Sequence, residues 1–128
     1  MITYADAANI IYNDCHPLGI TVFPDGRKLR GRVTSECVTI HSKKQQKGKI
    51  WEDSFVEVNI FVPDKEEGEA DTIRLGEFAK KAKYVFESTG EYNGSSYDYG
   101  VFSIGMDYDE VSGCHYVNVR ILFKVLNV

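Results

Sequence analysis

The chain has 128 residues, of which 43% are hydrophobic and 27% are charged. This length and balance are typical of one globular domain and exclude a chain that is disordered throughout. Fifteen basic and nineteen acidic residues give a net charge of −4, which excludes a general affinity for the phosphates of nucleic acids. We therefore expect one domain over residues 1–128 that makes no direct, sequence-specific contact with nucleic acid.

The cysteines indicate a reducing compartment. Cys15, Cys37 and Cys114 are odd in number and widely spaced, which does not fit a disulfide framework. Residues 1–11 have no basic segment and carry Asp6, so they do not predict a signal peptide. No apolar run approaches the roughly 20 residues of a membrane helix. We expect a protein that is made and used in a cytoplasm and has no membrane partner.

The first element expected is a helix over residues 3–16. Thr3 followed by Asp6 resembles a capping box, with Asp in place of the usual Glu. Pro17 cannot continue the helix, and Gly19 permits a sharp exit from it. The apolar stripe that indicates the helix consists of Tyr4, Ala7, Ala8, Ile11 and Cys15.

Three strands are expected to follow, over residues 20–23, 33–42 and 51–62. The turn sequence Pro-Asp-Gly at residues 24–26 separates the first strand from the second. The third strand has the clearest period of two, which predicts that one of its faces is buried. That face consists of Val56, Val58, Ile60 and Val62.

An exposed loop is expected between the second and third strands, because residues 43–49 read KKQQKGK and contain no apolar anchor. Three interpretations of this loop remain open. It is a mobile, solvated tip, or a nucleic-acid contact that lacks an interleaved aromatic residue for base stacking, or a projection that touches a partner or lines a channel. The residues of this projecting loop are Lys43, Lys44, Lys47, Lys49 and Trp51.

The second half of the chain begins with a helix over residues 71–88, which Asp71 caps and Gly90 stops. Strands over residues 97–106 and 114–126 then form a closing hairpin. The buried face of the helix consists of Leu75, Phe78, Ala79, Ala82, Val85 and Phe86. The buried face of the last strand consists of Val117, Val119, Ile121, Phe123 and Val125.

This order of elements predicts the α+β fold class. One helix, three strands, a second helix and two strands follow one another, and hairpins join most of the strands. We therefore expect a two-layer sandwich, in which a mainly antiparallel sheet carries both helices on one face.

The other face of the predicted sheet mixes apolar and polar residues. Scattered apolar residues are common on protein surfaces, and that is one interpretation. The other interpretation is a subunit interface, because interfaces concentrate aromatic residues and Arg within a polar surround. The residues of this hypothetical oligomer interface are Phe55, Phe61, Tyr116, Arg120, Leu122 and Leu126.

No motif predicts a catalytic, cofactor-binding or metal-binding residue. The glycines form no phosphate loop, and neither G-x-S-x-G nor H-E-x-x-H occurs. Two Cys-His pairs, at residues 15–16 and 114–115, lack the spacing of structural zinc ligands. Adjacent residues of a strand also point to opposite faces. The carboxylates within residues 64–71 and 107–110 fall in predicted loops, where we expect them to be solvated.

Several segments carry a resemblance to a known family. They are the helix ADAANIIYNDCHPLGI, the strand and turn VFPDG, the strand FVEVNIFVPD, the helix DTIRLGEFAKKAKYVFES and the closing strand HYVNVRILFKVLNV. This succession resembles the small tail-terminator and tail-completion proteins of long-tailed bacteriophages and the related head–tail joining proteins. The loop KKQQKGKIWEDS is longer than that pattern.

The resemblance implies a structural protein of a phage or prophage rather than an enzyme. Such proteins form a homo-oligomeric ring, typically of six subunits, that ends tail-tube growth or joins the tail to the head. The implied partners are tail-tube or head–tail connector proteins, in the host cytoplasm during assembly and then in the virion. Terminator, connector and completion roles all remain open.

Two other classes of function also remain open. One is a non-catalytic adaptor or secretion-system-like interaction module, and the other is a small-molecule-binding domain or enzyme. A ring requires contacts between two different patches of each subunit. One hypothetical pairing joins the basic loop to the acidic segment of a neighbour, that is, Lys43, Lys44 and Lys47 to Glu66, Glu67, Glu69 and Asp71.

Overall fold

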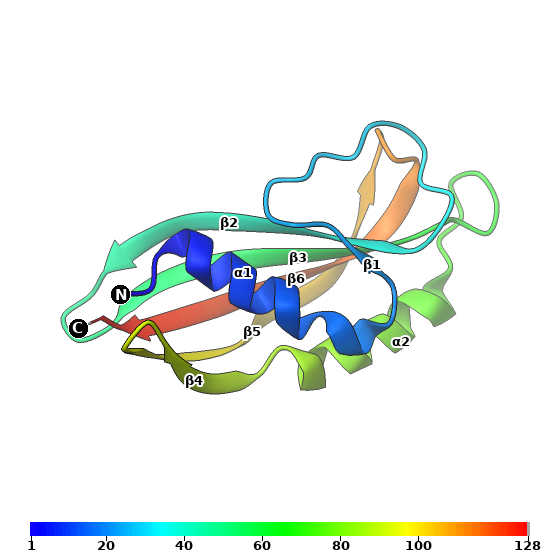
Figure 1. Cartoon of the computed structure of the whole chain (residues 1–128). Helices are drawn as coiled ribbons and strands as arrows, with labels where there is room; N and C mark the ends of the chain where they lie inside the picture. The colour runs from blue at the N-terminus through cyan, green and yellow to red at the C-terminus, as the bar shows by residue number, and fades with distance from the viewer. Residues whose placement is uncertain (128) are drawn as a thin grey trace.

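The computed structural model describes residues 1–127, which form one curled sheet and two helices (Figure 1). The helices are α1 (Tyr4–Asp14) and α2 (Thr72–Val85), and a short 3₁₀ turn, η1 (His16–Leu18), follows α1. The strands are β1 (Thr21–Val22), β2 (Cys37–Lys47), β3 (Glu52–Val62), β4 (Ser88–Tyr92), β5 (Ser95–Asp109) and β6 (Cys114–Leu126).

The six strands lie in the order β1-β2-β3-β6-β5-β4. All neighbours are antiparallel except β1 and β2, which are parallel. The centre of the sheet consists of β3 and β6, in which Val58 pairs with Val119. The sheet is mainly antiparallel, as the sequence predicts.

The predicted two-layer sandwich with both helices on one face is wrong. Strands make up 46% of the chain and helices only 22%, and the sheet curls into a half barrel (Figure 1). Within it α1 packs mainly on β2, and α2 packs on β5 and β6. The physical reason is the coiling of long twisted strands, which the bulges at Ser42/Gln45 in β2 and Val101/Ser103 in β5 increase.

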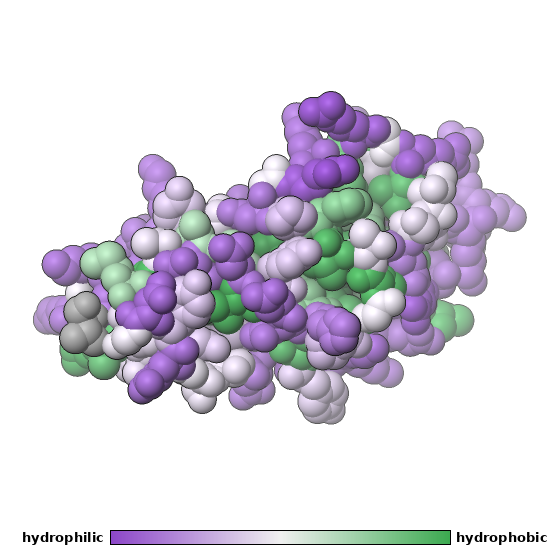
Figure 2. Space-filling view, viewed as in Figure 1, coloured by the Kyte–Doolittle hydropathy of each residue, from purple (hydrophilic) through white to green (hydrophobic). Residues whose placement is uncertain are grey.

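The main core lies in the hollow of this half barrel. Val56, Val58 and Ile60 of β3 are fully buried there, which confirms the predicted alternation. The predicted face of β6, from Val117 to Val125, is buried opposite them. Figure 2 shows the side of the molecule that carries α1, where polar side chains cover most of the periphery and apolar ones gather near β1.

The start of α1 is a capping box, as predicted. Thr3 Oγ1 accepts a hydrogen bond from the Asp6 amide at 3.3 Å, and the Asp6 carboxylate accepts one from the Thr3 amide at 2.9 Å. Ala7, Ala8 and Ile11 are buried as expected, whereas Tyr4 is exposed and lies outside the stripe.

The predicted loop over residues 43–49 is wrong for its first five residues, which continue β2 as far as Lys47. Gln45 anchors this polar end of the strand. Its side-chain amide donates to the backbone oxygen of Ile2 at 3.1 Å and to Glu52 Oε2 at 2.7 Å. The actual turn consists of residues 48–51.

A strand that the sequence reading missed, β4, follows α2. The helix begins at its predicted cap, where Asp71 accepts from the Arg74 amide at 3.2 Å, but it ends at Val85 rather than at residue 88. Gly90 does not stop the helix but lies within β4, and a Cβ there would come within 2.8 Å of a ring carbon of Tyr97. The glycine is therefore needed for the close approach of that ring.

A long segment between β1 and β2, residues 23–36, crosses the outer face of the sheet beside the β5–β6 hairpin (Figure 1). It is joined to β2 by hydrogen bonds from the Phe23 amide to the Val38 oxygen and from the Gly26 amide to the Ile40 oxygen. It is joined to the β5–β6 turn by the Val33 amide, which donates to the Ser112 oxygen at 3.0 Å. This segment divides the outer face into a covered part and an open part.

Candidate functional site

The covered part of the outer face contains two of the predicted interface residues. Phe61 is only 5% exposed, and its ring centroid lies 4.8 Å from that of Tyr116. They belong to a second small core beneath the crossing segment, with Phe23, Leu29, Val33, Cys37 and Cys114. Phe61 and Tyr116 therefore pack within the chain.

The open part of the outer face contains Phe55, Arg120 and Leu122, with Phe102 beside them. The Arg120 guanidinium carbon lies 3.9 Å from the ring centroid of Phe55, and the rings of Phe55 and Phe102 meet edge-on with centroids 5.1 Å apart. Phe102 is 59% exposed. We call these four residues the aromatic patch.

The charge of Arg120 is not paired with a carboxylate in the described chain. Its Nε is buried and has no hydrogen-bond partner there. Glu57 faces Arg120 across the β3–β6 pairing, but its Oε2 lies 3.1 Å from Lys43 Nζ instead. The aromatic patch thus presents one unpaired cation among two aromatic rings.

The last predicted interface residue, Leu126, lies at the end of β6 and pairs with Ser96. It is exposed, but it is four residues along the strand from Leu122. The predicted interface residues therefore do not form one group: two lie in the second core, three in the aromatic patch and one at the end of β6.

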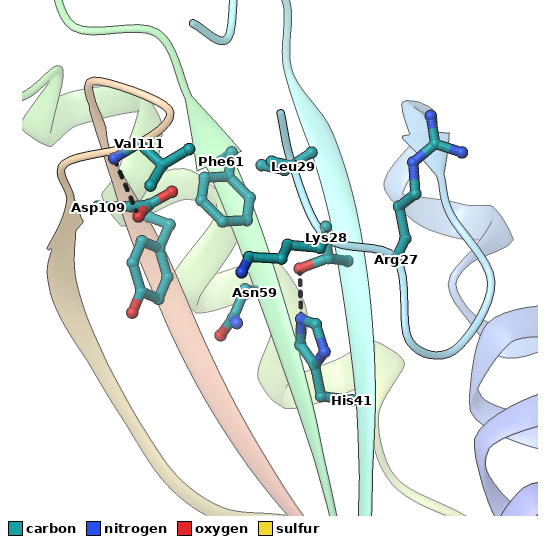
Figure 3. Close-up of a pocket in the computed structure, with 10 residues that line it drawn as sticks. Arg27, Lys28, Leu29, His41, Asn59, Phe61, Asp109 and Val111 are labelled. Carbon is teal, nitrogen blue, oxygen red and sulfur yellow. Dashed lines mark hydrogen bonds between the residues drawn. The ribbon is translucent and has the colours of Figure 1, made fainter. Parts of the chain in front are cut away.

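A small pocket opens between the two parts of the outer face (Figure 3). Phe61 and Tyr116 form its apolar floor, Lys28 reaches over it from the crossing segment, and His41 lies at its side. Arg27 lies at the rim, where its guanidinium carbon is 4.6 Å from the centroid of the Phe23 ring. It holds about 200 Å³, which is below the range of about 300–1,000 Å³ typical of ligand pockets.

Several polar groups of this pocket are hydrogen-bonded within the chain. His41 Nε2 and Thr39 Oγ1 are 3.2 Å apart, and Asn59 Oδ1 accepts from Asn118 Nδ2 at 2.7 Å. The Asp109 carboxylate accepts from the amides of Val111 and Ser112, which fixes the β5–β6 turn. Thr39 is almost fully buried, so the Thr39–His41 pair offers no accessible nucleophile.

All three cysteines are buried with free thiols. Burial raises the pKa of the Cys15 thiol to about 12, and the neighbouring Asp14 carboxylate adds to this effect. Burial also raises the pKa values of Cys37 and Cys114. Thiols with raised pKa values stay protonated and are poor nucleophiles and metal ligands.

No cluster of three or more His, Cys, Asp or Glu side chains within residues 1–127 is arranged to hold a metal ion. The two Cys-His pairs diverge. Cys114 lies in the second core, whereas His115 Nδ1 lies 3.0 Å from Asp64 Oδ1, and His16 is exposed beside buried Cys15. No helix of this part of the chain is long and apolar enough to cross a bilayer.

The predicted projecting loop is the end of the β2–β3 hairpin. Lys43, Lys44 and Lys47 lie on β2, while Lys49 and Trp51 lie in the turn. The turn is closed by the Gly48 amide, which donates to the Trp51 oxygen at 2.8 Å. We call residues 48–51 the hairpin tip; they expose Ile50, at 71%, and Trp51, at 37%.

An apolar groove between α2 and β5 was not foreseen from the sequence. It holds about 250 Å³ and is lined by Leu75, Gly76, Ala79, Ile104, Met106 and Val117. The helical stripe predicts burial of Leu75 and Ala79, but nothing in the sequence pattern shows that β5 leaves a gap beside them. Met106 remains 56% exposed.

Comparison of the sequence with known protein families and with curated proteins finds no match to either.

Proposed function

We propose that this chain is a non-catalytic structural subunit of a long-tailed phage or prophage. In this proposal, copies of the chain associate into a ring at the tail or head–tail junction, where the ring ends tail-tube growth or joins the tail to the head. The partners are then further copies of the chain and tail-tube or head–tail connector proteins. Assembly takes place in the host cytoplasm, and the ring becomes part of the virion.

The observation that carries the proposal is the aromatic patch. Aromatic rings and an unpaired Arg on an open sheet face are typical of a protein interface. Arg stacks on aromatic rings and retains donors for a partner's carboxylates or carbonyls. The raised pKa values of the cysteines and the small size of the pocket favour a structural role over catalysis. The resemblance in element order supplies the phage context.

Substitution within the aromatic patch tests the proposal. Phe102→Asp places a charge at the exposed centre of the patch, where it leaves the buried core untouched. We expect this variant to fold like the wild type and to need at least about a tenfold higher concentration to self-associate, because an aromatic anchor contributes roughly 2 kcal/mol or more.

The matched control is Tyr92→Asp, which alters an exposed aromatic residue on edge strand β4. We expect it to assemble as the wild type does. Sedimentation velocity measures both, and electron microscopy of the assembled fraction shows whether the particles are rings. Equal assembly of Phe102→Asp and the wild type would remove the aromatic patch from the proposal.

A further inference from the structure

The crossing segment carries a run of unpaired cations. Between Gly26 and Val33 its sequence reads RKLRGR, which contains four basic residues and no acidic one. All four are exposed, and none lies within ion-pair distance of a carboxylate in the part of the chain that the structure describes. These cations, which we call the basic run, are Arg27, Lys28, Arg30 and Arg32.

The carboxylates at the two ends of the crossing segment are bound to other partners. Asp25 accepts hydrogen bonds from the amide and the hydroxyl of Ser42, both at 2.7 Å. Glu36 accepts from the Arg74 guanidinium, with Nη2 and Oε1 2.8 Å apart. Neither carboxylate is therefore available to pair with the basic run.

The apolar residues of the crossing segment hold it against the sheet. Leu29 and Val33 are partly buried and pack on the second small core. The Gly26 amide donates to the Ile40 oxygen at 3.0 Å at one end, and the Val33 amide donates to the Ser112 oxygen at 3.0 Å at the other. The cations remain outside, and Figure 2 shows strongly hydrophilic side chains over this segment at the top of the molecule.

This division of side chains indicates the class of partner. A protein partner is recognised mainly by apolar and aromatic residues at the centre of an interface, but the only apolar side chain within residues 27–32 is Leu29, which packs inward. Interfaces with nucleic acid are more polar and much more positively charged. Three of the four cations are Arg, which binds phosphate through two parallel N–H donors. The composition favours a nucleic-acid backbone over a protein surface.

The same segment favours a duplex over a single strand. Proteins that bind single strands stack the bases on aromatic side chains. The one aromatic residue of the crossing segment, Phe23, is partly buried, and the Arg27 guanidinium carbon lies 4.6 Å from its ring centroid. This ring is thus already covered on one face. Contacts to phosphates carry no sequence information, so a duplex of any sequence would fit.

We propose that the basic run binds the phosphate backbone of double-stranded nucleic acid without sequence specificity. The net charge of −4 averages over the whole chain, whereas a phosphate contact depends on the cations beside it. Asp109 and Glu110 of the adjoining β5–β6 turn repel phosphates, so the contact is confined to the basic run and is weak. This inference goes beyond the proposed structural role and requires no second copy of the chain.

Fluorescence anisotropy of a short labelled DNA duplex of mixed sequence measures the contact. Four phosphate contacts predict that Kd rises about 12-fold for each doubling of the salt concentration, since its logarithm changes by about 0.9 per contact. Arg30→Gln combined with Arg32→Gln removes two of the contacts. Kd of this double variant should rise only about 3.5-fold per doubling of salt, and at about 50 mM salt it should be at least about tenfold higher than that of the wild type.

The matched control is Lys80→Gln combined with Lys81→Gln. It removes two exposed cations from α2 and so changes the net charge by the same amount. We expect the control to bind the duplex as the wild type does, with the same dependence on salt. Circular dichroism and urea unfolding establish that both double variants are folded, as the exposure of all four substituted side chains predicts.

Two competitors test the other classes of partner. Polyglutamate stands for an acidic protein, and vesicles rich in anionic lipid stand for a membrane. We expect neither to displace the duplex at an equal concentration of charges, because a duplex carries one charge per roughly 1.7 Å of its axis. Displacement by either competitor at that concentration would overturn the assignment to nucleic acid.

Two further results would overturn the proposal. One is equal binding by the two double variants, because net charge rather than the basic run would then determine the affinity. The other is the absence of binding by the wild type at about 25 mM salt, where phosphate contacts are strong. Both results would leave the proposed self-association standing, because Arg30 and Arg32 are not part of the aromatic patch.

Discussion

The charge of Arg120 is left without a carboxylate partner because a neighbouring lysine pairs with the nearest carboxylate. Its partner across the strand pairing is Glu57, but Lys43 lies 3.1 Å from Glu57 and holds that carboxylate. The guanidinium of Arg120 stacks on Phe55 instead. An Arg that lies over an aromatic ring keeps donors for a partner, and both Arg and aromatic residues are enriched among the residues that dominate binding energy.

The buried thiol of Cys15 predicts how the stability of the fold depends on pH. Burial raises the pKa of its thiol from the ordinary 9.0 to about 12. The folded-state pKa lies above the unfolded one, so the stabilisation is fully present below pH 9 and is lost between pH 9 and 12. The free energy of unfolding should therefore fall across this range, and Cys15→Ala should reduce the fall by up to about 1.4 kcal/mol per pH unit.

Urea unfolding at pH 8 and pH 11 measures this difference. Cys37 and Cys114, whose pKa values burial also raises, contribute equally to the wild type and the variant. The pKa of Tyr99 is raised mainly by burial and in part by the charge of Cys15, so the comparison reports Cys15 together with its effect on Tyr99. An identical loss of stability in both proteins would contradict the assignment.

Some single-residue roles were readable from the sequence because they depend only on near neighbours. The Thr3–Asp6 capping box and the Asp71 cap are confirmed, since such bonds span three residues. Phe102 was not identified, because the bulge at Val101/Ser103 decides which way it points. The burial of Phe61 was likewise missed, because it depends on a distant segment that crosses over it.

At the scale of elements, the β4–β5 hairpin turns at the dipeptide Asn93-Gly94, a sequence typical of tight hairpin turns. Asn93 and Gly94 have φ values of 50° and 79°, as a tight two-residue hairpin turn requires. The flanking residues are not apolar enough to indicate a strand by themselves, and pairing with β5 holds β4 in place. The lysines and the bulge of β2 also act locally. They disfavour pairing of this exposed strand edge with strands of other molecules.

Two glycines allow the same substitution to be compared in opposite environments. At Gly48 a Cβ would lie 2.5 Å from the Trp51 oxygen, so Gly48→Ala should lower the free energy of unfolding by about 1–2 kcal/mol. At Gly76, inside α2, a Cβ meets nothing, so Gly76→Ala should raise that free energy by about 0.5–1 kcal/mol. Urea unfolding of both variants is the measurement, and the same sign at both positions would contradict the geometry.

The whole molecule differs from the expected sandwich because alternation specifies faces and not curvature. The buried faces of β3 and β6 were predicted correctly, but period two is the same in a flat sheet and in a half barrel. Curling depends on strand length, twist and bulges acting together. The groove between α2 and β5 could not be predicted either, because it forms only where the curl of the sheet separates β5 from α2.

The arrangement of surfaces gives the molecule two unlike ends. The hairpin tip and the aromatic patch lie toward one end, and the apolar groove lies toward the other. A contact between two unlike surfaces of neighbouring copies builds rings or filaments rather than two-fold dimers. Ring formation requires that copies of this chain bind one another. Self-association is therefore the central claim.

Light scattering of the wild-type chain over a wide concentration range, with and without a divalent salt, tests that claim most directly. We predict a discrete species of several subunits, with six subunits being the number that the phage-tail resemblance implies. A monomer at every concentration and in every salt would contradict the account.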